Sequence, residues 1–302
     1  MRLRAFCIAA ALVCATELVA AQAPSFSVRS NLVSVPVIVT DLRGQPVRDL
    51  AASRFTVFED GQRRPVAAFA HERVPLSLVV ALDASLSMSG GRLRLAAEAV
   101  RALGGHARSD DQLALTAFNA TAFLVAPWTS SPSAVVSAVP SVGAAGGTAL
   151  YEGVNLALDV AGNAANPFAA VVVISDGHDS TRVEMRPMRE ARTVERIRRT
   201  DVAVFAIGLN VPAANAGDPA ADFDAMSLSR LAEPSGGFAR VVTSASALPA
   251  AARMIREQLD ERYVLGFAPE RATDQRFHRI RVEVAGCQCK VRARAGFMGG
   301  GQ

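Results

Sequence analysis

The chain of 302 residues is poor in the residue types that mark several common classes of protein. Cysteine occurs four times, and only Cys287 and Cys289 lie beyond the first 21 residues. Two cysteines cannot make a disulfide scaffold, and one Cys-x-Cys with scattered histidines offers too few ligands for a zinc site. On a strand the two side chains would share a face, near the upper limit of spacing for a bridge. Free or loosely paired thiols are therefore the favoured prediction.

Lysine is almost absent, because Lys290 is the only one among 32 basic residues and the others are arginine. The net charge of +4 is small for this length. The Arg-dense stretch 182–199 also carries Glu184, Glu190 and Glu195, which predicts a solvated helix face. No basic run is uninterrupted or interleaved with aromatic residues, so we expect no nucleic-acid partner.

The motifs of several enzyme classes are also missing. The sequence has no Gly-x-Ser-x-Gly elbow, no phosphate loop with Gly-Lys-Ser/Thr, and no Gly-x-Gly-x-x-Gly after the first strand of its α/β region. His178, which follows Asp176 closely, leaves a metal-assisted hydrolase open as an alternative. No second acid–base group or activated nucleophile accompanies it, so an exposed loop histidine is favoured. We expect a protein that is not an enzyme.

Residues 1–21 have the pattern of a secretory signal peptide. Arg2 and Arg4 supply the positive start, an apolar core follows, and small residues at 19–21 precede the expected cut. Glu17 interrupts a segment that is already too short to span a membrane. No later stretch is apolar enough to span a bilayer. We expect a mature protein without a membrane span that is exported to the periplasm or secreted.

From residue 76 onward, strand-like and helix-like patterns alternate. Expected strands cover 76–83, 112–118, 169–176, 202–209 and 238–242, with 121–126 as a short antiparallel edge strand. Expected helices cover 92–104, 132–139, 148–161, 186–199, 224–232 and 247–262. This alternation predicts an α/β fold with a doubly wound, mainly parallel, Rossmann-like sheet that is covered on both faces.

Strand patterns flank this α/β region on both sides. Before it, a mostly period-2 pattern covers 33–40 with Ile38 out of place, and two more strands are expected at 55–58 and 65–69, around the turn Asp60-Gly61. After it, strands are expected at 263–267, 277–284 and 290–295. Because a few strands cannot form a stable unit alone, we expect both ends to pair into one small β-sandwich-like module. The predicted boundaries are 1–21 for the signal peptide, 24–72 for the N-terminal β-region, 75–255 for the α/β domain with a metal site, and 256–302 for the C-terminal β-strands.

Oxygen-bearing side chains stand at the ends of the expected strands and at the start of one helix. Asp83, Ser85 and Ser87 form an Asp-x-Ser-x-Ser triplet, Thr148 follows two glycines, and Asp176 ends another strand. Each alone is more often a helix cap or a turn residue. In a parallel sheet, however, the carboxyl ends of the strands converge on one crevice. Hard oxygen ligands that meet there favour Mg²⁺, Mn²⁺ or Ca²⁺ over Zn²⁺.

These residues match, one for one, the metal-ion-dependent adhesion site of the von Willebrand factor type A family, and the chain resembles this family over roughly residues 75–255. The resemblance implies that Ser85 and Ser87 hold the ion directly, while Asp83 and Asp176 act largely through waters. It implies that Thr148 coordinates directly or through water, and that an Asp or Glu of a protein partner completes the shell. Asp179, just beyond Asp176, is expected to be a turn or capping residue, and a position at the border of the crevice stays open as the alternative.

The flanks extend the resemblance. They contain Val-Thr-Asp-x-x-Gly near residue 40, Phe-Thr-Val-Phe-Glu-Asp-Gly from Phe55, Tyr-Val-Leu-Gly-Phe from Tyr263 and a closing Arg-Ala-Gly-Phe. These motifs resemble a bacterial group of exported VWFA-related proteins that is abundant in acidobacteria. The resemblance implies a metal-dependent binding module for adhesion or scaffolding. A structural role for the metal in an envelope assembly stays open beside it.

Overall fold

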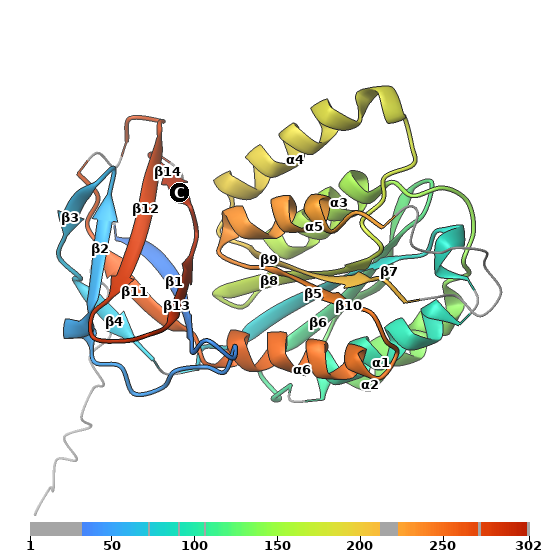
Figure 1. Cartoon of the computed structure of the whole chain (residues 1–302), viewed down its shortest axis with the longest axis horizontal. Coiled ribbons are helices and arrows are strands. Elements are labelled where there is room, and N and C mark those ends of the chain that lie inside the picture. The colour runs from blue at the N-terminus through green and yellow to red at the C-terminus, as the bar shows by residue number, and fades with distance from the viewer. Residues whose placement is uncertain are drawn as a thin grey trace, which may run out of the picture. The chain divides into compact units, whose positions relative to one another are not determined.

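The computed structural model describes residues 32–71, 73–89, 91–105, 107–211, 223–270 and 273–300. The predicted signal peptide at 1–21 lies outside these residues. Within them, the strands form one mostly parallel sheet and two antiparallel sheets (Figure 1). Among the described residues, no helix combines the length and the apolar character that are needed to cross a membrane.

The mostly parallel sheet lies at the centre of the α/β part and has six strands among the described residues, in the order β10-β9-β8-β5-β6-β7. All neighbours are parallel except β7, which is antiparallel to β6 as expected for the edge strand. Every residue of β5 and β9 is buried, because helices cover both faces of the sheet. The strands are β5 (Leu76–Asp83), β6 (Gln112–Phe118), β7 (Ala122–Thr129), β8 (Phe168–Ser175), β9 (Ala203–Leu209) and β10 (Ala239–Val242).

Helices pack on the two faces of this sheet (Figure 1). On one face α1, α2 and α6 enclose one apolar core, and on the other face α3, α4 and α5 enclose a second. The doubly wound fold is therefore confirmed. The helices are α1 (Arg92–Gly104), α2 (Pro132–Ala138), α3 (Leu150–Gly162), α4 (Arg186–Arg199), α5 (Ala225–Ala232) and α6 (Ala247–Asp260).

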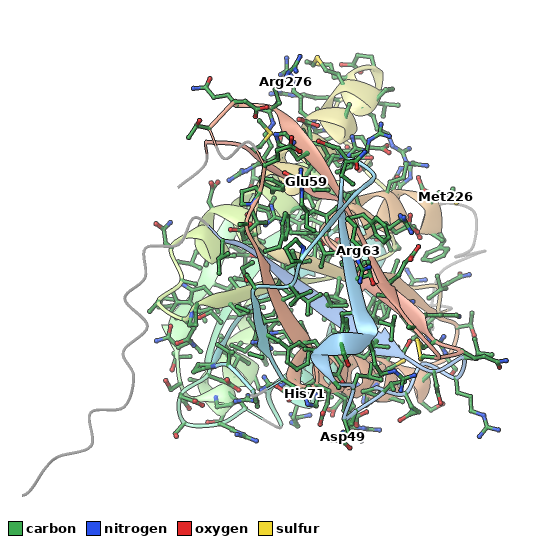
Figure 2. All side chains as sticks on the ribbon, turned by 90° about the vertical axis from the view of Figure 1, so that its left-hand side faces the viewer. Asp49, Glu59, Arg63, His71, Met226 and Arg276 are labelled. Atoms are coloured by element: carbon green, nitrogen blue, oxygen red, sulfur yellow. A yellow bond between two sulfur atoms is a disulfide. The ribbon has the colours of Figure 1, made fainter. Side chains whose placement is uncertain are left out.

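Strands from the two ends of the chain pair with one another in a β-sandwich, as predicted. One sheet has the order β13-β1-β11-β4 and the other β14-β12-β2-β3. Figure 2 views the molecule from this side, with Glu59 on β2 and Arg63 on β3 labelled. The strands are β1 (Val33–Thr40), β2 (Phe55–Glu59), β3 (Gln62–Arg64), β4 (Ala68–Ala70), β11 (Tyr263–Phe267), β12 (Phe277–Val284), β13 (Lys290–Ala293) and β14 (Gly296–Met298).

The burial of β1 explains the break in its sequence pattern. Val35, Val37 and Val39 point into the core of the sandwich. Ile38 points the other way and joins the core of the α/β part that contains residues of α1 and α6. Ile38 is apolar because this strand is covered on both faces.

The strand predicted at 65–69 is wrong in its extent. The chain forms β3 before this segment and β4 at its end, and the two strands belong to different sheets. Pro65 lies between them, where it has no backbone N–H to donate to a ladder. The turn Asp60-Gly61 does join a hairpin, because both residues have positive φ, as a tight two-residue turn requires.

Cys287 and Cys289 form a disulfide, which corrects the prediction of free or loosely paired thiols. The prediction considered the spacing that the two side chains would have on a strand. In the structure both lie in the segment that joins β12 to β13, outside either strand, and their Cα atoms are 5.3 Å apart. This distance is within the usual range for disulfides.

Candidate functional site

The candidate site lies at the carboxyl ends of β5 and β8. β5 is a central strand with β6 on one side and β8 on the other, so the chain order reverses at this position. Such a reversal leaves a crevice outside the carboxyl ends of the strands. Asp83 is the last residue of β5, and Asp176 directly follows the last residue of β8. Both predicted aspartates therefore stand at the same edge of the sheet.

Asp83 is completely buried at this edge. Its Oδ1 accepts a hydrogen bond of 2.9 Å from the Ser85 amide, and its Oδ2 accepts one of 2.6 Å from the Ser175 hydroxyl. Burial, and then the charge of Asp176, raise the pKa of Asp83 to about 7 despite these hydrogen bonds. Two carboxylates are thus held close together away from solvent, in an arrangement that a cation would stabilise.

The two serines of the triplet converge beside Asp83. Ser85 is buried, whereas Ser87 lies in the short 3₁₀ turn η2 (Leu86–Met88) and is exposed. Their hydroxyl oxygens are 2.9 Å apart. The loop after β5 therefore presents two hydroxyl oxygens together, one of them within reach of solvent.

Thr148 lies in the loop that precedes α3, because this helix begins at Leu150 and not at Thr148 as predicted. Two backbone hydrogen bonds tie the loop to the one after β5, from Leu86 to Gly146 at 3.0 Å and from Ala145 to Ala84 at 2.9 Å. Thr148 itself is buried, and its hydroxyl makes no hydrogen bond to another described residue. The Thr148 hydroxyl is therefore not engaged by another side chain or carbonyl in the described part of the chain.

A further set of bonds ties the Thr148 loop to the loop after β8. The Ser180 hydroxyl accepts a hydrogen bond of 2.7 Å from the Thr148 amide, and the Ser180 amide donates one of 3.0 Å to the Thr148 carbonyl. The bond between Ser175 and Asp83 joins the last residues of β8 and β5, from which the other two loops begin. The structure brings the three loops that carry the five predicted ligands to one edge of the sheet.

The donor set at this edge fits a hard cation. It comprises two carboxylates and three hydroxyls, which are oxygen ligands of the kind that Mg²⁺ and Ca²⁺ take. Across the described part of the chain, no group of three or more His, Cys, Asp or Glu side chains is arranged to hold a metal ion. A metal site here would therefore depend on the serine and threonine hydroxyls as well as on the two aspartates.

Gly177, directly after Asp176, is required by the packing of this loop. Its φ of +84° lies in the left-handed region, and a Cβ atom would come within 2.3 Å of the Asp224 carbonyl oxygen. The Asp224 amide also donates a hydrogen bond of 3.0 Å to the Asp176 carbonyl. The start of α5 is thereby packed against the loop that carries Asp176.

Sequence reasoning gave no role to Ser175 or Ser180, although both belong to the framework of the site. The signal for Ser175 was its position at the end of a buried strand beside Asp176. Asp179 is buried, and its carboxylate accepts a hydrogen bond of 3.4 Å from the Tyr151 amide in the first turn of α3. Asp179 also pairs with Arg189 at 3.0 Å, so this arginine of α4 is not part of a fully solvated face.

His178 is half-buried in the loop after β8. Its amide donates a hydrogen bond of 3.2 Å to Asp176 Oδ1. Its ring makes no hydrogen bond, ion pair or ring contact with any other residue that the structure describes. No contact in this region orients the ring as a general base.

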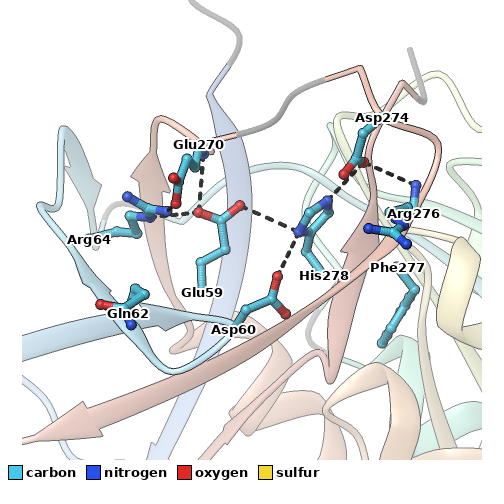
Figure 3. Close-up of a pocket in the computed structure, with 9 residues that line it drawn as sticks. All are labelled: Glu59, Asp60, Gln62, Arg64, Glu270, Asp274, Arg276, Phe277 and His278. Carbon is cyan, nitrogen blue, oxygen red and sulfur yellow. Dashed lines mark hydrogen bonds and ion pairs between the residues drawn. The ribbon is translucent and has the colours of Figure 1, made fainter.

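A second polar cluster surrounds His278 on the sandwich and lines a cavity of about 280 Å³ (Figure 3). The Nδ1 atom of His278 is 2.7 Å from Asp60 Oδ2, and its Nε2 atom is 2.9 Å from Asp274 Oδ1. The buried Glu59 lies next to this histidine and pairs with Arg64 at 2.6 Å. The hydrogen bond with Asp274, and then that with Asp60, raise the pKa of His278. Opposite charges are paired within this cluster, which indicates that it stabilises the sandwich.

Residues 78–178 match the family model for the von Willebrand factor type A domain, which covers less than half of the chain. The matched stretch includes all five predicted ligands. No protein among the curated ones matches the chain.

Solved structures show the same fold at low sequence identity. A von Willebrand factor type A structure from Catenulispora acidiphila is 15% identical, with a TM-score of 0.54, and the match covers 90% of this chain and 75% of that one. The proximal thread matrix protein 1 of the mussel byssus, with a zinc-occupied MIDAS motif, is 15% identical, with a TM-score of 0.52, over 67% of this chain and 49% of that one. A D319A mutant of the PilB minor pilin from Streptococcus sanguinis is 11% identical, with a TM-score of 0.52, over 64% and 63% of the two chains. The α/β part therefore has the fold of von Willebrand factor type A domains.

Proposed function

We propose that this protein is an exported binding module that captures an acidic side chain of a protein partner through a divalent cation. The ligands of this cation are Asp83, Ser85, Ser87, Thr148 and Asp176. The proposed ion is Mg²⁺, and Mn²⁺ or Ca²⁺ are the alternatives. The observation that carries the proposal is the set of hydrogen bonds that joins the ends of β5 and β8 and ties the Thr148 loop to the loops that follow both strands. The comparisons support it, since the mussel protein of the same fold has zinc in its MIDAS motif.

Each part of the site has a task in this proposal. A divalent cation bound there supplies a Lewis-acidic position that a carboxylate from another protein can fill. Asp83 and Asp176 supply the negative charge, and their burial keeps this charge poorly screened. Ser87 is exposed, so it lies on the side from which a partner would approach. Ser175 and Ser180 hold the loops in position.

The site supports binding better than catalysis. His178 is the only histidine beside the five ligands in the sequence, and no contact with a described residue orients its ring. We place the protein with the exported bacterial VWFA-related group on the strength of its flanking motifs. The proposal of export rests on the signal-peptide pattern of residues 1–21, and mass spectrometry of the protein secreted by a bacterial host should find a mature chain that begins at Gln22.

Calorimetric titration tests the metal site. The wild type should bind Mg²⁺ and Mn²⁺, and the Asp83→Ala variant should not. Asp159→Ala is the matched control, because Asp159 is an exposed aspartate on α3 that pairs with Arg196. A titration of the wild type that stays flat with both ions would refute the metal site.

The partner is tested in a second experiment. Crosslinking of the wild type in the presence of Mg²⁺ should capture a protein that is lost with a chelator and lost in Asp83→Ala. Replacement of single acidic residues of the captured protein should then identify one carboxylate on which binding depends. If chelation lowers thermal stability strongly but leaves the captured protein unchanged, the metal has a structural role instead.

A further inference from the structure

The disulfide between Cys287 and Cys289 lies at an unusual place for a structural bridge. Only Gln288 separates the two cysteines, so the closed loop is about as short as a disulfide loop can be. A disulfide stabilises a fold mainly by restricting the unfolded chain, and this effect grows with the length of the loop. The bridge therefore contributes little in this way.

The strands on either side are held without the bridge. β12 pairs with β2 along Ile280–Val284 and with β14 at its other end. β13 pairs with β1 in the opposite sheet. The apolar core of the sandwich lies between these sheets and contains residues from both ends of the chain. Opening of the bridge would leave these pairings in place.

The two cysteines are partly exposed, and a positive charge is fixed at the residue that precedes Cys287. Cys287 and Cys289 are half-buried, and Gln288 is exposed. The Arg54 guanidinium donates hydrogen bonds to the carbonyls of Ala285 at 2.7 and 2.9 Å and of Gly286 at 2.5 Å. The guanidinium is thus fixed at the carbonyl of Gly286, the residue that precedes Cys287 in the chain. A nearby cation stabilises a thiolate, and partly exposed cysteines in such surroundings are the reactive ones.

From these observations we propose that Cys287 and Cys289 form a redox-active pair that exchanges with thiols while the protein stays folded. The substrates are thiol compounds, either a small thiol or a cysteine pair of another protein. This activity is independent of the proposed metal site, because the two sites share no residue.

The exchange balances as a two-electron reaction. A thiolate from the substrate attacks the Cys289 sulfur, the bond between the two cysteines breaks, and Cys287 leaves as a thiolate beside Arg54. A second substrate thiolate attacks the sulfur of the substrate in this mixed disulfide, and Cys289 leaves as a thiolate. The substrate is oxidised to a disulfide, the protein is reduced to a dithiol, and the two protons of the substrate thiols pass through water to the two cysteines.

The test uses the full mature chain in glutathione redox buffers at neutral pH, with free thiols counted by mass after maleimide labelling. Glutathione in the millimolar range should reduce the bridge reversibly, while circular dichroism and Tm stay those of the oxidised protein. A parallel experiment uses a reduced Cys-x-x-Cys peptide in place of glutathione, at equal thiol concentration. Faster reduction by glutathione would identify a small thiol as the substrate. Faster reduction by the peptide would identify a cysteine pair of another protein. A bridge that opens only when the protein unfolds would overturn the proposal.

Variants test the roles of single residues. Arg54→Gln should slow reduction by glutathione several-fold, and Arg63→Gln, an exposed arginine on β3, should leave the rate unchanged. The Cys287→Ser variant should form a stable mixed disulfide with oxidised glutathione at Cys289. The double variant Cys287→Ser/Cys289→Ser should keep the Tm of the wild type. A large loss of Tm in this double variant would show a structural bridge, and an unchanged rate in Arg54→Gln would remove Arg54 from the mechanism.

Discussion

The Ser175 hydroxyl donates a hydrogen bond of 2.6 Å to Asp83 Oδ2 across the pair of neighbouring strands β5 and β8. The same hydroxyl accepts a hydrogen bond of 3.0 Å from the Gly177 amide, so its position is defined from both sides. Ser175 therefore orients the carboxylate that is central to the proposed metal site, and it does so from a strand that is distant in the sequence.

Ser175→Ala should weaken cation binding without loss of the fold. Removal of a side chain that orients a metal ligand typically costs about 10- to 100-fold in affinity. Calorimetric titration with Mg²⁺ measures the effect, and Ser141→Ala, at an exposed serine in the short turn after α2, is the control. Equal affinities of Ser175→Ala and the wild type would show that Asp83 is oriented without this bond.

Asp83→Asn should stabilise the metal-free protein at pH 8. The pKa of Asp83 is raised from 3.8 to about 7 in the folded chain, so the folded state binds more protons than the unfolded state between these values. The contribution of Asp83 to the free energy of unfolding is thus fully present below about pH 4, and it is lost as the pH rises through 7. Since one pKa unit corresponds to about 1.4 kcal/mol, the variant should gain about 2 to 4 kcal/mol at pH 8. Urea unfolding in a chelator at pH 5 and pH 8 measures this gain, which should shrink at the lower pH.

Asp111→Asn should destabilise the protein by about 3 to 5 kcal/mol, because it removes a completely buried negative charge between two arginines and leaves the less buried Asp260 to pair with both. Asp111 is completely buried and pairs with Arg73 and Arg256. Burial alone would raise its pKa, but the hydrogen bonds from Arg256 and from the Leu76 amide lower it.

The neighbouring residue is the control for this variant. Asp110→Asn changes an exposed carboxylate that lies 3.7 Å from Arg73, and it should cost less than about 1 kcal/mol. Urea unfolding of both variants at pH 7 measures the difference. Similar losses in the two variants would contradict the role of the buried cluster.

His278→Gln should destabilise the sandwich in a way that depends on pH. Asp274 and Asp60 raise the pKa of His278 in the folded protein above its unfolded value of 6.5. The stabilisation by the charged imidazole is therefore fully present below pH 6.5, and it is lost as the pH rises through the raised pKa. The pKa values of Asp60 and Asp274 are lowered in the folded protein. The stabilisation by these two carboxylates is therefore present above about pH 3.8, and it is lost at lower pH. The largest loss, about 1 to 2 kcal/mol, is therefore expected between pH 4 and 6.5. Thermal unfolding across this range measures it, with His178→Gln as the control, and a loss that is constant from pH 5 to 9 would refute the charged pair.

Several elements could be predicted from the sequence because their local patterns are strong. The bounds of β5, β6, β11, β12, α1 and α4 agree with those that the sequence predicts. Each of these segments has an apolar periodicity that extends over several residues. In contrast, β3 and β14 have three residues each, and β3 consists of Gln62, Arg63 and Arg64. Such strands have no pattern of their own, and their pairing with β2 and β12 is what defines them.

The sequence by itself determined the alternation of strands and helices, and it placed Asp83 and Asp176 at strand ends, because side-chain periodicity and turn residues act over a few positions. The five ligands stay a prediction of the sequence that the arrangement of the loops supports. Only the tertiary structure decided how the loops are joined through Ser175 and Ser180, and that Cys287 and Cys289 bond outside a strand. Hydrogen bonds between loops and the geometry of a turn depend on where distant segments lie in space, and no local pattern contains that information.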